Sequence, residues 1–231
     1  MKLNYNKPSD VARKGFTLVE LLVVMAIIAV LASIAVPTVL DKLKDADRTK
    51  AVSQIKGVYT SILEFEAEYG TRPGQLVVDD DLVENAAATN ANDCFRQLIQ
   101  AGLLKTEAPF EIKSLVNSES DKYIGESPAY AEALEKGENG FLYMDNRKAK
   151  EGAPLAAAPL AKEEGSFDYL AFNGKAVVLV VGGSVRTVDI NEDTEKTEVK
   201  AGKDKTIDMF SAANKTFSTS EPPNPKYPDA R

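Results

Sequence analysis

A single carboxylate lies within an otherwise apolar segment near the start of this sequence. The segment runs from Phe16 to Leu40, and the polar side chains within it are those of Thr17, Glu20, Ser33 and Thr38. A carboxylate near the middle of a bilayer costs on the order of 2.5–3.5 kcal/mol on insertion scales, and less near the end of a helix. Glu20 therefore needs a partner, and an ionisable residue in such a segment indicates a functional site.

The rest of the sequence offers little chemistry. There is no histidine, which excludes Ser-His-Asp and Cys-His catalysis and removes the commonest imidazole metal ligand. The one cysteine, Cys94, cannot form an intramolecular disulfide, and we expect it to be a buried, inert thiol. The acidic run 79–81 could attract calcium, but it lacks a recognisable ligand spacing and is better interpreted as a solvated turn. We assign no catalytic residue, no cofactor and no metal ligand.

An amine could neutralise Glu20. Gly15 and Phe16 mark a sharp boundary between a basic stretch, which ends in Arg13 and Lys14, and the apolar segment. Cleavage of the bond between Gly15 and Phe16 would retain the whole apolar segment and create an ammonium group on Phe16. Two opposite charges in apolar surroundings cost less when they are paired than when either is left alone.

The apolar segment is long enough to cross a membrane. As a helix, residues 16–40 would measure about 38 Å, against about 30 Å for the hydrocarbon core of a bilayer. The preceding Arg13 and Lys14 predict a cytoplasmic N-terminus. Three alternatives remain: a secretory signal peptide with a cleavage site at residues 32–35, a permanent single-span anchor, and a buried core helix. The segment is longer than the usual apolar core of a signal peptide.

The motif Lys14-Gly15-Phe16-Thr17-Leu18-Val19-Glu20-Leu21-Leu22 resembles the prepilin signal of type IV pilins and type II secretion pseudopilins. The resemblance implies cleavage after Gly15 by the prepilin peptidase and N-methylation of Phe16 by the same enzyme. It also implies an assembly role for Glu20, whose carboxylate would pair with the N-terminal ammonium of an adjoining subunit. Pro37 is similar to a proline that pilin helices often carry, and it is expected to kink the helix. The alternative is that the helix ends there.

A helix-type periodicity continues beyond the apolar segment. Apolar residues recur at three- and four-residue steps as far as Tyr69, and Gly70 and Pro73 then end the pattern. The members of this stripe are Ala51, Val52, Ile55, Val58, Tyr59, Ile62, Phe65 and Tyr69. One helix from about Phe16 to Tyr69 is therefore predicted. The charged patch 41–50 mixes both signs and is interpreted as a solvated collar, with ion pairs between subunits as the alternative.

The remaining chain predicts a small antiparallel sheet and one short helix. Residues 175–181 and 184–190 form two strand patterns joined by Gly182-Gly183, which is a hairpin signal and matches no phosphate-binding loop. Further strands are expected at 76–78 and 140–144, a helix at 92–104 capped by Asn90 or Asn92, and an irregular loop at 145–168. The fold class is thus α+β: a long N-terminal α-helix, with a protruding apolar first half and an amphipathic second half packed against a small antiparallel β-sheet head domain.

Four regions follow from these patterns. Residues 1–15 are a cleaved leader peptide in the prepilin interpretation, and residues 16–40 are a transmembrane and filament-core helix. Residues 41–70 are the amphipathic half of the helix, and residues 71–231 are a globular head with variable loops and a partly mobile C-terminal tail.

The net charge and the resemblance together indicate which classes of function the chain could have. The net charge is −7 overall and, because residues 1–50 are net positive by three, residues 51–231 carry −10, which disfavours nucleic-acid binding. The resemblance implies a structural, non-enzymatic subunit of a type IV pilus or type II secretion pseudopilus. Its implied partners are further copies and other pilin-like subunits in a filament, the prepilin peptidase, an inner-membrane assembly platform and, before assembly, membrane lipid.

The same resemblance implies a location. The precursor would cross the inner membrane once, with a cytoplasmic N-terminus and an extracytoplasmic head, and the filament would lie in the periplasm or at the cell surface. The alternative function is a membrane-tethered binding module of the cell envelope that does not polymerise.

Overall fold

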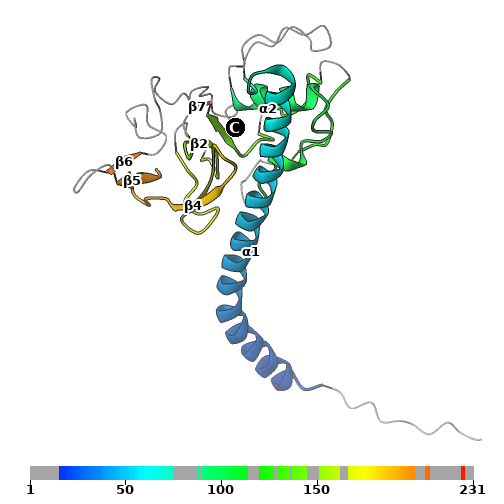
Figure 1. The fold of residues 1–231 in the computed structure, drawn as a ribbon. Helices are drawn as coiled ribbons and strands as arrows, with labels where there is room; N and C mark the ends of the chain where they lie inside the picture. Colours follow the sequence, from blue (N-terminus) through cyan, green and yellow to red (C-terminus); the bar gives the residue numbers. More distant parts are fainter. Residues whose placement is uncertain are drawn as a thin grey trace, which may run out of the picture. The chain divides into compact units, whose positions relative to one another are not determined.

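The computed structural model describes residues 16–74, 88, 90–113, 120–126, 130–135, 137–144, 151–161, 166–200, 206–208 and 225–226. The leader 1–15 with Gly15, the strand expected at 76–78, the acidic run 79–81 and most of the C-terminal tail lie outside these residues. The chain divides into two compact units, residues 1–42 and residues 43–231. Figure 1 shows the order of the elements along the chain.

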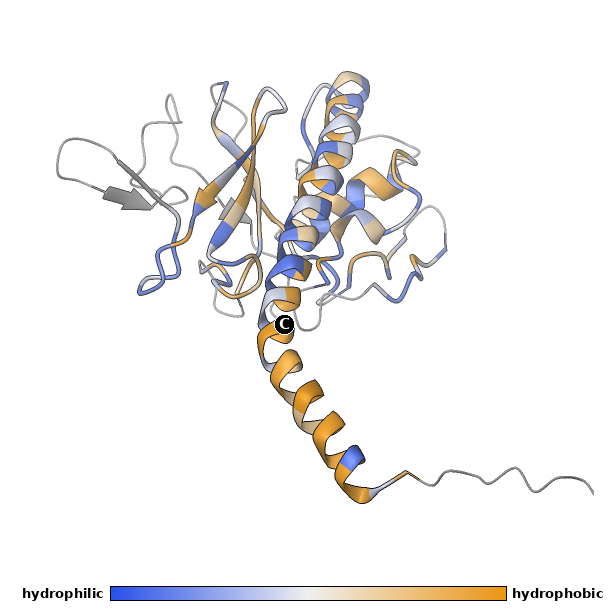
Figure 2. Cartoon of the chain, turned by 90° about the horizontal axis from the view of Figure 1, so that it is seen from below, coloured by the Kyte–Doolittle hydropathy of each residue, from blue (hydrophilic) through white to orange (hydrophobic). Residues whose placement is uncertain are grey.

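The predicted long helix is confirmed as α1, which runs from Leu18 to Tyr69. In its first part every side chain from Phe16 to Leu43 is exposed, and Figure 2 shows that this part is predominantly hydrophobic. By length and composition α1 can cross a membrane. An apolar helix needs lipid or other helices around it, because water cannot solvate such a surface favourably.

The second part of α1 is amphipathic, as its periodicity predicts. The centre of the buried stripe is formed by Ala51, Ile55, Val58, Ile62 and Phe65. The other members of the predicted stripe lie at its edges and are half-buried: Val52, Tyr59 and Tyr69. The stripe packs in one apolar core with residues of a short helix and of the sheet.

Among the described residues of the second unit, five strands form an antiparallel sheet in the order β4-β3-β2-β1-β7. Their bounds are Leu142–Met144 for β1, Pro154–Ala158 for β2, Lys175–Val180 for β3, Val185–Asp189 for β4 and Pro225–Lys226 for β7. A separate antiparallel pair is formed by β5, Glu198–Lys200, and β6, Thr206–Asp208.

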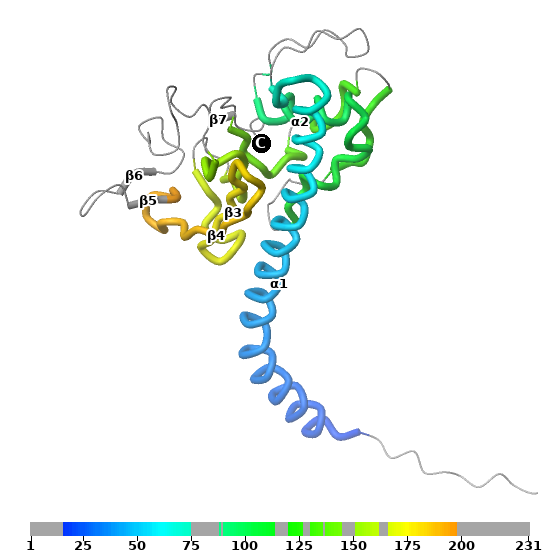
Figure 3. Tube along the Cα trace, in the orientation of Figure 1, coloured from blue at the N-terminus to red at the C-terminus, as the bar shows by residue number. Residues whose placement is uncertain are grey.

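The predicted hairpin is confirmed, with Lys175 opposite Asp189 and Leu179 opposite Val185. Its turn contains Gly182 at φ +102° and Gly183 at φ +80°, in the left-handed region that glycine adopts without strain. Strand β3 is buried on both faces: Val177 and Leu179 join the core that contains α1, and Val178 joins a second cluster on the other face. Figure 3 follows the chain through this hairpin.

The prediction of an irregular loop over residues 145–168 is wrong in part, because Pro154–Ala158 forms strand β2. This strand lies between β1 and β3 and is fully buried. Three of its five residues are alanines, which are depleted in strands, so local propensity gives no strand signal. Pairing on both edges satisfies the buried backbone and overrides that propensity.

The predicted short helix is α2, Ala91–Gln100. Of the two proposed caps, Asn90 is the one used: its Oδ1 accepts from the N–H of Asp93 at 2.9 Å. The helix ends before residue 104 because Gly102 adopts φ +72° and the N–H of Leu103 turns back to the carbonyl of Leu98. Cys94 is buried, as expected. A short 3-10 helix, η1, follows at Ala108–Phe110.

Candidate functional site

Glu20 is held at the N-terminus of α1 by reciprocal hydrogen bonds with Thr17. Its Oε2 accepts from the backbone N–H of Thr17 at 2.9 Å and from the Thr17 hydroxyl at 2.7 Å. The N–H of Glu20 in turn donates to Thr17 Oγ1 at 3.2 Å. This arrangement is a capping box, and it places a carboxylate where the unpaired N–H groups of a helix favour negative charge.

The capping role of Thr17 was not predicted from the sequence, where this threonine counts only as a polar interruption of the apolar segment. A threonine followed three residues later by a glutamate, immediately before an apolar run, is the sequence signature that could have found it. Phe16 directly precedes the bonded pair and is 75% exposed. The structure therefore brings Phe16 and Glu20 to the same helix end, while Gly15 lies outside the described residues.

The other polar residues of the apolar segment also bond within the helix. The hydroxyl of Ser33 donates to the carbonyl of Val30 at 2.7 Å, and that of Thr38 donates to the carbonyl of Ala35 at 2.8 Å. These local hydrogen bonds satisfy the two hydroxyl groups without water. A helix surrounded by lipid or by other apolar helices requires this, because no water is available there. Pro37 lies inside α1, and the kink expected there stays a prediction.

Part of the charged patch 41–50 bonds within the chain. Arg48 forms an ion pair with Asp45 at 3.2 Å and donates to the carbonyl of Phe172 at 3.4 Å. The side-chain amide of Asn173 donates to Asp45 Oδ1, also at 3.4 Å. Both charged side chains are half-buried, so the interpretation of the whole patch as a solvated collar is wrong for these two residues.

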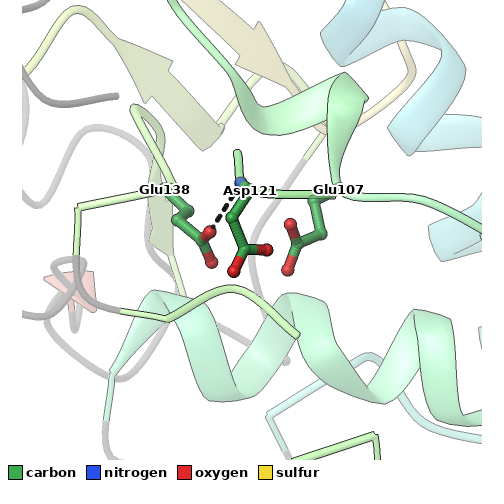
Figure 4. A group of neighbouring side chains, drawn as sticks. All are labelled: Glu107, Asp121 and Glu138. Carbon is green, nitrogen blue, oxygen red and sulfur yellow. Dashed lines mark hydrogen bonds between the residues drawn. The ribbon is translucent and has the colours of Figure 1, made fainter. Parts of the chain in front are cut away.

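Three carboxylates that the sequence reasoning did not single out meet in the second unit. Oxygens of Glu107, Asp121 and Glu138 all lie within 4.8 Å of one another, with Asp121 in the middle (Figure 4). Glu107 is completely buried and accepts from the hydroxyl of Ser120 at 2.6 Å and from the N–H of Leu134. No spacing in the sequence indicates this cluster, because its members come from separate loops.

Hydrogen bonds give this carboxylate cluster a structural role. Glu138 accepts from the N–H of Asp121 at 3.0 Å and from the N–H of Glu135. Burial raises the pKa of Glu138, the charges of Glu107 and Asp121 add to this effect, and the two backbone donors oppose it. Hard cations bind carboxylate oxygens. However, hydrogen bonds from backbone N–H groups of the loops already hold Glu107 and Glu138 in place. We therefore assign no metal to this carboxylate cluster.

Comparison with known proteins bears on the N-terminal segment. Residues 11–36 match the family described as the prokaryotic N-terminal methylation motif. A fimbrial protein of Neisseria meningitidis is 36% identical over 62 residues, which are 27% of this chain and 36% of that protein. A fimbrial protein of Pseudomonas aeruginosa is 46% identical over 50 residues, 22% of this chain and 32% of the relative. Type II secretion system core protein G of Pectobacterium carotovorum is 37% identical over 65 residues, 28% and 42% of the two chains.

These matches cover about a third of the length of the curated relatives. No solved structure matches this chain. The resemblance of the N-terminal segment to pilins and type II secretion pseudopilins is thus confirmed, and the helix with the small antiparallel sheet agrees with the predicted α+β class.

Proposed function

We propose that this chain is a structural subunit of a type IV pilus or a type II secretion pseudopilus. The observation that carries the proposal is the placement of Glu20. It is the one carboxylate of the exposed apolar segment 16–40, and it lies in the first turn of α1, near Phe16 and inside the methylation motif of residues 11–36. A soluble subunit has no use for such a surface, whereas a filament core buries it.

Processing is the first step of the proposed function. The prepilin peptidase would cut after Gly15 and methylate the new N-terminal amine of Phe16. The family model of the N-terminal methylation motif matches residues 11–36, which include the bond between Gly15 and Phe16, and this match supports the step. Before assembly the helix would hold the chain in the inner membrane, with the second unit on the extracytoplasmic side.

Assembly is the second step. In lipid the Glu20 carboxylate would still accept two hydrogen bonds from Thr17 of the same chain. These bonds lower the free-energy cost of burying the charge but do not neutralise it. The methylated ammonium of a neighbouring copy would supply the missing positive charge. Removing the exposed apolar side chains of several copies from lipid into one bundle would then build the filament core, and an assembly platform in the membrane would drive it.

The proposed role is mechanical and not catalytic. The absence of histidine from the sequence and the acidic character of residues 51–231 agree with a subunit that presents a soluble surface on a filament. Its partners would be further copies and other pilin-like subunits.

The mature N-terminus tests the proposal directly. Mass spectrometry of the protein purified from its native membranes or filaments should show a chain that begins at Phe16 and carries one methyl group on its amine. A chain that still begins at Met1 would instead support a membrane-tethered binding module, and a chain that begins near Val36 would support a secreted protein. Either result would overturn the proposal.

A further inference from the structure

Strand β1 lies inside the sheet of the second unit, and its two edges are covered unequally. The strand, Leu142–Met144, is fully buried. One edge pairs with β2, which has five residues, and the other pairs with β7, which has only the two residues Pro225–Lys226. Because a buried backbone N–H or C=O group without a partner costs free energy, β1 needs β7 to satisfy its second edge.

The register assigns opposite directions to the backbone groups of the two residues of β7. Lys226 is opposite Tyr143, and Pro225 is opposite Met144. In an antiparallel pair, opposite residues alternate between pairs that exchange both hydrogen bonds and pairs whose N–H and C=O groups point away from each other. Proline has no N–H, so the exchanging pair cannot be the one with Pro225. This alternation assigns the exchanging pair to Lys226 and turns the backbone of Pro225 toward the outer edge.

The outer edge of β7 is also the end of the sheet on this side. Among the described residues no strand follows β7 in the order β4-β3-β2-β1-β7. An edge strand with free N–H and C=O groups can pair with a strand of another chain. Such pairing needs donors, and proline offers none. The residue of β7 whose backbone faces outward is thus the one that cannot donate.

The opposite edge of the sheet is protected in a different way. Strand β4 carries Arg186 and Asp189, whose side chains are exposed. Charged side chains on an edge strand disfavour the addition of a further strand. Strand β7 has only two residues, so protection of its edge depends largely on Pro225.

We propose that β7 is the closing strand of the sheet: Lys226 satisfies the edge of β1, and Pro225 prevents a second copy of this chain from adding a strand there. The inference concerns the second unit alone, so it does not rest on the proposed function. Its effect is largest wherever copies of the chain are crowded, as in a filament, because open edges then meet often.

Restoring the missing N–H at residue 225 tests the proposal in the full chain. Pro225→Thr supplies that donor in a residue that favours strands. The matched control is Pro228→Thr, which removes a proline from the same part of the sequence but outside β7. The wild-type chain and both variants, isotopically labelled at the amide nitrogens of lysine and threonine, are studied by NMR and light scattering in the same mild detergent.

The first measurement is amide exchange in dilute protein. In Pro225→Thr the N–H of Lys226 should exchange with solvent at least about tenfold more slowly than the new N–H of residue 225, because the former bonds to β1 and the latter faces water. Slow exchange at residue 225 would overturn the proposal, because that N–H would then face β1. Equally fast exchange at both positions would also overturn it, because β7 would then not close the sheet.

The second measurement is self-association at rising protein concentration. Pro225→Thr should form larger assemblies at concentrations at which the wild-type chain and Pro228→Thr do not, and the N–H of residue 225 should become protected in them. The apolar segment is the same in all three chains, so its own association does not affect the comparison. Association of Pro225→Thr that only equals that of the wild type, or that of Pro228→Thr, would overturn the proposal.

A second substitution separates strand addition from unfolding. Pro225→Ala restores the same N–H with a smaller side chain, and it should associate as Pro225→Thr does, with an unfolding midpoint in urea equal to that of the wild type. Association confined to a variant whose midpoint has fallen would overturn the proposal, because unfolded chains would then be its cause.

Discussion

The aromatic ring of Tyr59 on α1 lies directly against Gly183 in the turn between β3 and β4. A Cβ atom on Gly183 would come within 2.6 Å of Tyr59 Cε1, a separation that real Cβ atoms essentially never show. The Tyr59 hydroxyl also accepts from the N–H of Gly182 at 3.2 Å. The two glycines therefore serve both the positive φ of the turn and its close approach to the helix.

Replacing Gly183 should destabilise the second unit. Gly183→Ala combines a strained positive φ with a steric clash, and we expect a loss of about 1–3 kcal/mol in the free energy of unfolding. Urea unfolding of the full chain in mild detergent measures this. The control is Gly57→Ala: a Cβ there would meet nothing within 4 Å, so in a helix it should stabilise by about 0.5–1 kcal/mol. Equal effects of the two substitutions would contradict the role of Gly183.

Gln54 should stabilise the segment around η1. Its side-chain amide donates to the carbonyl of Ala108 at 2.7 Å and to that of Glu111 at 3.1 Å. Gln54→Ala removes both bonds, and a loss of about 1–2 kcal/mol is expected in the same unfolding measurement. Ser53→Ala, on the exposed side of the same helix, should change stability by less than about 0.5 kcal/mol. Indistinguishable unfolding midpoints for the two variants would refute the assignment.

The carboxylate cluster predicts a pH effect of defined sign. Because burial and the charges of Glu107 and Asp121 raise the pKa of Glu138, the folded state binds this proton more tightly than the unfolded state does. The stability that Glu138 contributes is therefore complete below its ordinary value of 4.5 and is lost as pH rises through the raised pKa.

Asp121→Asn tests that effect, because it removes one of the charges and keeps an acceptor for the N–H of Tyr123. The titration midpoint of Glu138, followed by carboxyl-carbon NMR, should fall, and the loss of stability with rising pH should shrink. Asp193→Asn, which removes a charge from an exposed turn outside the cluster, should leave that midpoint unchanged. A midpoint that stays or rises in Asp121→Asn would show that its charge does not act on Glu138.

Gly15→Leu should block processing, because the bulky side chain would occupy the position next to the cut bond. The precursor should accumulate in the membrane at its full length, and mass spectrometry should find no chain that begins at Phe16. Maturation of this variant at the same bond would show that the cleavage assignment is wrong.

Glu20→Val should separate insertion from assembly. The change removes the charge from the apolar helix, so membrane insertion should be retained or improved, while incorporation into filaments should fall. Ser33→Val is the matched control, since it also replaces a locally bonded polar residue of the segment with valine and leaves Glu20 intact. Subunits with Glu20→Val that enter filaments as well as those with Ser33→Val would exclude the assembly role.

Much of this protein follows from local sequence. The apolar run and the stripe through Ile55 and Ile62 define one helix to Tyr69 because period and length are properties of neighbouring residues. The Gly182-Gly183 turn between two strand patterns likewise predicts the hairpin. The threonine and glutamate at the start of the apolar run carry the capping box in four consecutive residues, so this part of the candidate site was readable from sequence, although only Glu20 was singled out.

Other features depend on contacts between distant residues. Strand β2 exists because β1 and β3 pair with both of its edges, against the weak strand preference of its alanines. The meeting of Glu107, Asp121 and Glu138 and the bond between Asp45 and Asn173 likewise join segments that no periodicity relates. The local sequence pattern determines which secondary structure each segment favours by itself. Which segments pair, and which side chains become buried between them, is decided only when the whole core packs.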